Sequence, residues 1–143
     1  MSELKFGITL NEGAGSMAEE ARRAEALGFD SVWVCETRLV RDAVTPLAAF
    51  APMTKRIKLA TGVILLPYRD PIILAKQLAT LDHFSNGRLI VGLGLGFARD
   101  EFESIRPRAK KAHRGRMLDE KMEALKLLLS RGSEEVSYKG KYV

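Results

Sequence analysis

Apolar residues along this chain fall into two alternating patterns. Short runs rich in β-branched and aromatic residues predict four strands, at residues 5–10, 31–36, 57–66 and 88–96. Each run is followed by apolar residues at helical spacing, which predict helices beginning near residues 16, 45, 70 and 116. The chain is therefore predicted to contain four consecutive βα units, an alternation typical of a parallel sheet covered by helices.

Local signals indicate where the predicted helices begin and end. Ser16 and Glu19 have the spacing of a capping box, and Gly28 ends that helix. Pro52 shortens or bends the second helix, and Asp70-Pro71 caps the third. The last helix carries Leu118, Met122, Leu125 and Leu129 on one face. The terminal EEVSYKGKYV is expected to start a further extended element.

Two architectures have this pattern of elements. One is a doubly wound open sheet, complete in itself. The other is a (β/α)8 barrel, for which about 250 residues are typical, so that 143 residues would supply about half. In both, ligands gather at the carboxyl ends of the strands. Those ends are predicted at residues 10–11, 35–37, 65–67 and 94–97.

Length and composition bound the class of protein. The 143 residues suit a single domain, 1–143, and a hydrophobic content of 46% with 29% charged residues is ordinary for a globular protein. The single cysteine excludes an internal disulfide and favours a reducing, cytoplasmic location. No apolar run approaches the roughly 20 residues that cross a bilayer, and the N-terminus lacks the pattern of a signal peptide. We therefore expect a cytoplasmic protein with no membrane partner.

The net charge of +5 comes from one segment. Residues 106–116, RPRAKKAHRGR, hold six basic side chains and no acid, and the rest of the chain is about neutral. We interpret this basic segment first as a solvated loop and second as a rim that attracts an anion near a ligand site. Nucleic acid is the least favoured partner, because no aromatic residues are interleaved to stack on bases.

Glycine recurs at every second position of the last predicted strand, at Gly92, Gly94 and Gly96. This spacing does not fit the G-x-G-x-x-G fingerprint of a dinucleotide site. Alternating glycines leave one face of the strand end without side chains, which either accepts a planar ring or makes room for neighbouring side chains. Gly62 also lies inside a predicted strand, where it indicates a bulge or a close backbone approach.

Few other residues have the chemistry of a catalytic site. Glu36 ends the second strand, where its carboxylate is either a general acid or base or the ion-pair partner of an arginine. Cys35 is expected to be a small buried residue. His83 and His113 have no metal-ligand spacing, so we predict structural or solvated roles for both and no metal site.

Four stretches together resemble the luciferase-like family of flavin-dependent oxidoreductases. They are AEALGFDSVWVCE, TPLAAFAPMTKRIKLATGVILLPYRDP, LAKQLATLDHFSNGRLIVGLGLG and RGRMLDEKMEAL, which cover nearly the whole chain. The resemblance implies an α/β fold of the (β/α)8 TIM-barrel type, with only the first four βα units present. It also implies an oxidoreductase that uses reduced FMN or the deazaflavin coenzyme F420 for hydride transfer to or from a small organic substrate, with monooxygenation among the family's reactions.

The resemblance further implies where the cofactor and substrate would lie. Matching of motifs puts a non-proline cis peptide at Gly62-Val63, against the central ring of the cofactor, and puts Gly94 and Leu95 beside that ring. Glu36 matches the acidic position that ends the second strand and, with Thr37, would face the substrate or the ring. Thr37 replaces a histidine that serves many members as catalytic base or substrate contact, and Leu95 replaces the arginine with which luciferase meets the FMN phosphate. These departures argue against a true luciferase and favour the deazaflavin-dependent members.

Length is the largest departure from the family, whose members run to more than twice these 143 residues. A half barrel exposes two strand edges, so we expect the chain to pair with a C-terminal half or to form a homo-oligomer. The alternative hypothesis is a non-catalytic half-barrel assembly module that dimerises through these open edges.

Overall fold

The computed structural model describes residues 4–11, 14–37, 40–109, 111–132 and 134–143. The chain divides into two compact units. The first comprises Met1–Ile64 with Thr80–Gly92, and the second comprises Leu65–Ala79 with Leu93–Val143. That the 143 residues form a single domain stays a prediction.

The elements follow the predicted order, with tighter bounds. The strands are β1 (Gly7–Leu10), β2 (Ser31–Val34), β3 (Lys58–Leu65) and β4 (Leu89–Gly94). The helices are α1 (Ala14–Ala26), α2 (Val44–Met53), α3 (Pro71–Ser85), α4 (Arg99–Ile105) and α5 (Arg114–Arg131), with 3-10 turns η1 (Leu66–Tyr68) and η2 (Pro107–Ala109). The four strands are confirmed, whereas α4 and the 3-10 turns were not predicted from the sequence.

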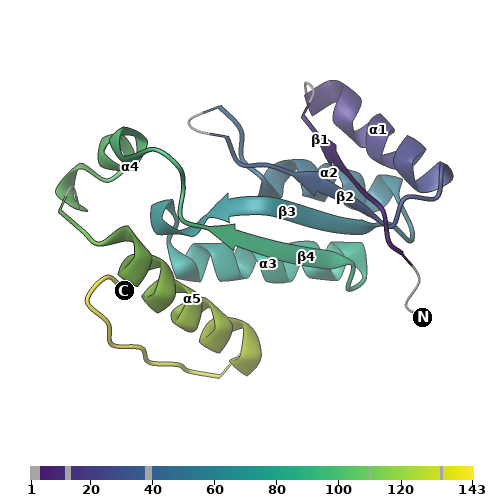
Figure 1. Ribbon diagram of the computed structural model, residues 1–143. Coiled ribbons are helices and arrows are strands. Elements are labelled where there is room, and N and C mark those ends of the chain that lie inside the picture. The colour runs from purple at the N-terminus through teal and green to yellow at the C-terminus, as the bar shows by residue number, and fades with distance from the viewer. Residues whose placement is uncertain (1–3, 12–13, 38–39, 110, 133) are drawn as a thin grey trace. The chain divides into compact units, whose positions relative to one another are not determined.

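The strands form one sheet in the order β1-β2-β3-β4, and Figure 1 shows them side by side. β1 pairs with β2, and β2 with β3, in parallel register, which sets Ile8 opposite Val32 and Val32 opposite Leu59. A doubly wound sheet reverses its strand order at a switch point, and the described strands show no such reversal. The sequential order therefore confirms the barrel type over the open sheet.

The core of the first unit lies between one face of the sheet and the helices α1 and α2, which pack against each other and against β2. Fully buried side chains there include Ala21 of α1, Leu47 of α2, and Val32 and Val34 of β2. Trp33, between the two valines, is only half-buried and lies on the opposite face. Because helices form the outer ring of a (β/α)8 barrel, the face that carries Trp33 is the inner one.

In the second unit, α4 and α5 pack against η1. Phe102 of α4 is fully buried, with its ring 5.8 Å from the ring of Tyr68. α5 buries Met117, Lys121, Ala124 and Leu125. Of the predicted apolar face, Leu125 is buried, Leu118 and Met122 are half-buried and Leu129 is exposed. The buried face differs from the predicted one because a lysine whose ammonium has hydrogen-bond acceptors occupies a core position.

Three predicted boundaries of helices and strands can be compared with the structure. Asp70 is confirmed as the cap of α3, since its Oδ1 accepts from the main-chain N–H groups of Ile72 and Ile73 at 2.9 and 3.0 Å. The cap at Ser16 is wrong, because α1 already begins at Ala14. The last residues, 134–143, form no strand. Tyr142 instead donates its main-chain N–H to Glu120 of α5 at 2.7 Å.

Candidate functional site

The carboxyl ends of β2 and β3 meet at Glu36 and Val63. The main-chain N–H of Glu36 donates to the carbonyl oxygen of Val63 at 3.3 Å. The Gly62-Val63 peptide bond is cis, which confirms the position that the family resemblance implied. Glu36 and Gly62 are half-buried, and Val63 is 36% exposed. An acidic residue and a partly open apolar segment are thus neighbours at this end of the sheet.

Thr37 begins a closely bonded loop next to Glu36. Its N–H donates to the carbonyl oxygen of Arg41, and its own carbonyl accepts from the N–H of Arg41, both at 3.2 Å. Arg41 also donates through Nη2 to the carbonyl oxygen of Asn11 at 2.6 Å. Asn11 directly follows β1. Main-chain bonds therefore join the carboxyl ends of β2 and β3, and the Arg41 side chain links them to the end of β1. Thr37 itself is exposed.

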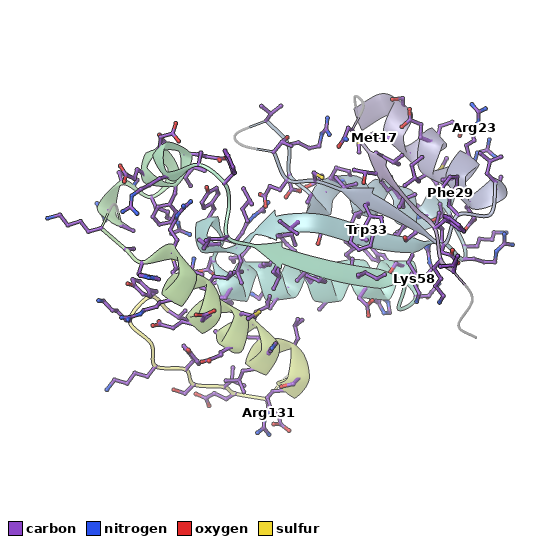
Figure 2. The ribbon with its side chains drawn as sticks, viewed as in Figure 1. Met17, Arg23, Phe29, Trp33, Lys58 and Arg131 are labelled. Carbon is purple, nitrogen blue, oxygen red and sulfur yellow. The ribbon has the colours of Figure 1, made fainter. Side chains whose placement is uncertain are left out.

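Trp33 packs against Gly62 on the inner face of the sheet, and Figure 2 shows it in the body of the sheet. Its indole N–H donates to Oγ of Ser31 at 2.8 Å, which fixes the orientation of the ring. A Cβ on Gly62 would lie only 3.1 Å from Cε3 of that ring. Glycine at this position therefore makes room for a neighbouring side chain, whatever else it contacts.

Neighbouring protein atoms also explain two of the three alternating glycines. At Gly92, an added Cβ would lie 2.3 Å from the carbonyl oxygen of Thr61. The Thr61 hydroxyl donates to the carbonyl of Gly92 at 3.0 Å and accepts from its N–H at 2.9 Å. At Gly96, φ is 85° and a Cβ would lie 2.7 Å from the phenol oxygen of Tyr68. Gly92 and Gly96 thus make room for protein rather than for a ring.

Gly94 is the last residue of β4, and Leu95 follows it; both are half-buried. Their predicted place beside a cofactor ring stays a prediction. Phe97 comes two residues later and is 95% exposed. The sequence therefore presents an open aromatic side chain just after the strand, at the end where ligands gather in barrels of this type.

The basic segment, residues 106–116, is more structured than the predicted solvated loop. It contains η2, and α5 begins within it. Arg106 donates through Nη2 to the carbonyl oxygen of Tyr68 at 2.8 Å, and Arg114 donates through Nη1 to that of Ala98 at 3.2 Å. For these two side chains the loop interpretation is wrong, because backbone carbonyls hold them. Lys110 lies outside the described residues.

His113 has the structural role that was predicted for it. It is the N-cap of α5, where Nδ1 accepts from the main-chain N–H of Arg116 at 3.2 Å. That bond satisfies a donor that the helix itself leaves unpaired. Cys35 is a free thiol and is half-buried, so it is less buried than expected.

A hollow of about 710 Å³ opens at the amino end of the sheet, away from Glu36. Phe29, Trp33 and Lys58, which Figure 2 labels, line it together with Ile90. In a closed barrel the side chains of all strands fill the interior, and ligands bind at the carboxyl end. We therefore assign this hollow to the barrel interior and not to the candidate site.

Two charged side chains, half-buried Glu25 and buried Arg88, bind the segment between α2 and β3. The Glu25 carboxylate accepts from the main-chain N–H groups of residues 55, 56 and 57 at 2.9, 2.5 and 2.8 Å. Burial by itself raises the pKa of Glu25, but these donors and the Arg56 charge outweigh it, and the net pKa lies below the usual value. Arg88 is 7% exposed and donates to the carbonyls of Ala51 and Ile57 at 2.9 and 3.0 Å. Both charged side chains therefore stabilise the fold and are not part of the candidate site.

Neither a metal centre nor a membrane segment is found in the part of the chain that the structure describes. No group of three His, Cys, Asp or Glu side chains there is arranged to hold a metal ion. No described helix is both long enough and apolar enough to cross a bilayer.

Sequence reasoning missed Trp33 and Lys121. Trp33 lies between Val32 and Val34, which face the core. Because successive side chains of a strand point to opposite faces, this position alone could have placed its ring on the other face of the sheet. Lys121 lies one helical turn from Met117 and from Leu125 in an otherwise apolar stripe. A lysine in such a stripe indicates a buried ammonium with acceptors of its own.

Comparison with known proteins gives one consistent result. The family model of the luciferase-like monooxygenases matches residues 4–143. An uncharacterised protein of Mycobacterium tuberculosis is 42% identical over 98% of this chain and 57% of its own length. The F420-dependent glucose-6-phosphate dehydrogenase of Amycolatopsis mediterranei is 34% identical over 91% of this chain and 41% of its own length. The chain therefore spans about half the length of these relatives.

A solved structure supports the fold. The oxygenating constituent of 3,6-diketocamphane monooxygenase from Pseudomonas putida, in complex with FMN, matches with a TM-score of 0.86 and 22% identity. The match covers 97% of this chain and 42% of that chain. At this identity the likeness concerns the fold alone, and it agrees with the predicted half barrel.

Proposed function

The chain belongs to the luciferase-like monooxygenase family, and we propose that it forms part of an oxidoreductase that uses reduced F420 or FMN. The reaction is hydride transfer to or from a small organic substrate or, with FMN and dioxygen, monooxygenation. The F420-dependent relative and the FMN complex of the structural neighbour support this pair of cofactors. Because the chain spans about half of its relatives, the activity of the whole protein is part of the proposal.

The observation that carries the proposal is the hydrogen bond between Glu36 and Val63. Glu36 is the predicted substrate-facing acid, and Val63 belongs to the predicted support of the cofactor ring. These two positions lie 27 residues apart in sequence, yet a main-chain bond of 3.3 Å joins them. A substrate against one and a ring against the other would therefore be neighbours.

The residues present fit a planar ring. Val63 is 36% exposed and Gly62 has no side chain, so this end of β3 offers a small apolar surface with no charged group of its own. Trp33 supports Gly62 from the inner face. We propose that Gly62 and Val63 back the ring and that Gly94 and Leu95 form a second wall. When bound, the reduced cofactor supplies a hydride.

Glu36 would transfer the proton that accompanies the hydride, and Thr37 would bind the substrate oxygen that takes part in this transfer. When a hydride adds to the carbon of a carbonyl, the π electron pair moves to oxygen, which must then gain a proton. Glu36 in its protonated form would donate that proton, and in the reverse direction its carboxylate would accept it. The Thr37 hydroxyl would hydrogen-bond the substrate oxygen, in the place of the histidine that many relatives have.

The proposed function also implies the partners of the protein. The substrate is a small molecule, and neither nucleic acid nor a membrane takes part. The exposed side chains of the basic segment, Arg108 and Lys111, would attract the anionic tail of the cofactor. We propose a cytoplasmic location, which the single cysteine fits, and pairing with a C-terminal half or a second copy.

A second candidate function is that of a non-catalytic assembly module. It is favoured by the outer strands β1 and β4, which end the sheet. Apolar residues on or beside them are exposed, namely Phe6 at 64%, Ile90 at 38% and Val91 at 37%. Exposed apolar strand edges pair readily with other chains, so such a module would dimerise without binding a flavin.

One experiment separates the two candidates. The purified chain is titrated with FMN and with F420 by absorbance, while light scattering gives its mass in the same buffer. Saturable binding of either cofactor supports the oxidoreductase. A stable dimer that binds neither supports the assembly module, and a folded monomer that binds neither contradicts both.

A further inference from the structure

The turn that follows β3 has a donor for each of its carbonyl groups from Leu66 to Asp70. Two of these donors are local, since the N–H of Arg69 bonds the carbonyl of Leu66 and the N–H of Leu74 bonds that of Asp70, both at 3.0 Å. The other three carbonyls accept from side chains of distant residues. Such complete pairing is what a backbone segment needs when it is held away from water.

Lys121 of α5 supplies two of those three bonds. Its Nζ donates to the carbonyl oxygen of Pro67 at 3.1 Å and also to that of Arg69. Lys121 is 4% exposed. A buried ammonium needs acceptors to offset the loss of hydration, and among the described residues the Lys121 ammonium finds them in main-chain oxygens of this turn. The turn and the ammonium therefore stabilise each other.

Arg106 supplies the third bond, from Nη2 to the carbonyl oxygen of Tyr68 at 2.8 Å. Two cations thus hold three consecutive carbonyls. The charges that act on Lys121 are Arg106, which repels it, and Asp70, which attracts it. Asp70 is itself engaged as the cap of α3. The arrangement has a net positive charge and is directed at backbone oxygens rather than at a carboxylate.

We propose that Lys121 and Arg106 are positioning residues that set the conformation of residues 66–70 and, through them, the carboxyl end of β3. The turn begins directly after Leu65, and β3 runs without a break from Lys58 through Gly62 and Val63 to Leu65. A change in the turn is therefore passed along a continuous strand to the surface that we propose supports the cofactor ring. This inference rests on the proposed function.

The test is amide hydrogen exchange of the full chain. Lys121→Met removes the ammonium at nearly constant length, and Lys126→Met, at an exposed position of the same helix, is the matched control. We expect Lys121→Met to speed exchange in a peptide spanning residues 66–74 by about tenfold. Exchange in a peptide spanning residues 31–36 should not change, and neither peptide should respond to Lys126→Met.

Arg106→Met is the second variant, in case Lys121→Met does not fold. It removes the bond to Tyr68 and the charge that repels Lys121, while both bonds of Lys121 remain, and it should speed exchange in the same turn by a smaller factor. Unchanged exchange in the turn would overturn the proposal. So would equal acceleration in β2, because that outcome means general destabilisation rather than a local role.

Cofactor titration of the same proteins tests the positioning role. We expect Lys121→Met to weaken FMN or F420 binding by about tenfold, since the strand end loses its fixed geometry. A loosened turn with unchanged affinity would contradict that role. If the wild-type chain binds neither cofactor, the proposed function fails, and the exchange rates alone still decide whether Lys121 and Arg106 set the turn.

Discussion

The main-chain N–H of Glu36 donates to the carbonyl oxygen of Val63 at 3.3 Å. Since both partners are backbone groups, a side-chain substitution at Glu36 leaves the bond in place. The chemistry of the Glu36 carboxylate can therefore be removed without moving the strand end beside it, and position can be separated from function by mutation.

Glu36→Gln should leave cofactor binding nearly unchanged, within about twofold, because the backbone bond persists and the side chain keeps its shape. Gly62→Leu should weaken binding by more than about tenfold, because its side chain covers the proposed ring surface and its Cβ would already lie 3.1 Å from Trp33. Isothermal titration with FMN and F420 measures both. Equal loss of affinity in the two variants would show that the carboxylate, rather than the flat surface, holds the ring.

Gly92→Ala should destabilise the chain by about 3 kcal/mol, because the new Cβ would lie 2.3 Å from the carbonyl oxygen of Thr61, a backbone atom with little freedom to move. Gly87→Ala is the control. Apart from Gly87 and its two chain neighbours, no protein atom lies within 4 Å of the added Cβ, and only the positive φ of 72° is unfavourable. It should cost about 1 kcal/mol. Urea unfolding measures both, and equal losses would mean that the close approach of β3 and β4 is unimportant.

Lys121 should make stability rise with pH on the alkaline side. Burial and the Arg106 charge lower the pKa of Lys121 from 10.5 to about 8. Between those pH values the unfolded chain binds more protons than the folded chain, so the free energy of unfolding increases. The gain is on the order of 3 kcal/mol. Lys121→Met should lack it, and denaturation of both proteins at pH 7.5 and 10.5 gives the difference. If the difference in unfolding free energy between the two proteins does not vary with pH, an ammonium that is costly to bury is contradicted.

Glu25 should contribute stability that is lost in acid. Its pKa is held below the usual value by three main-chain donors, so its contribution is complete above the unfolded pKa and disappears as pH falls through the folded one. Glu25→Gln should cost about 2 kcal/mol at neutral pH and flatten the acid side of the stability profile. Glu135→Gln, at an exposed position, is the control and should do neither. Parallel acid profiles for wild type and Glu25→Gln would refute this role.

The positions of the strands could be predicted because they depend on local patterns. The apolar run of β3 and the Asp70-Pro71 cap are short-range signals, and both are confirmed. The order of the strands, which decides between the two architectures, is a long-range property. This order was predicted only through family resemblance, and the structure shows it as β1-β2-β3-β4, with neighbours in the sequence paired in the sheet.

The site was less predictable because it depends on contacts between distant residues. The glycines of β4 looked alike in sequence, yet Gly92 is required by Thr61 and Gly96 by Tyr68. Neither partner could be identified from spacing. The burial of Lys121 likewise depends on the carbonyls of Pro67 and Arg69, more than 50 residues away. Helical periodicity alone therefore assigned the wrong face to α5.

The most direct test of the central claim uses Trp33, the only tryptophan of the chain. Its ring lies against Gly62, so a flavin or deazaflavin ring on Gly62 and Val63 must quench its emission by energy transfer. We predict saturable quenching of Trp33 fluorescence on titration with FMN or F420, retained in Gly87→Ala and lost in Gly62→Leu. Emission that does not respond to either cofactor, or quenching that survives in Gly62→Leu, would contradict a cofactor site at this end of β3.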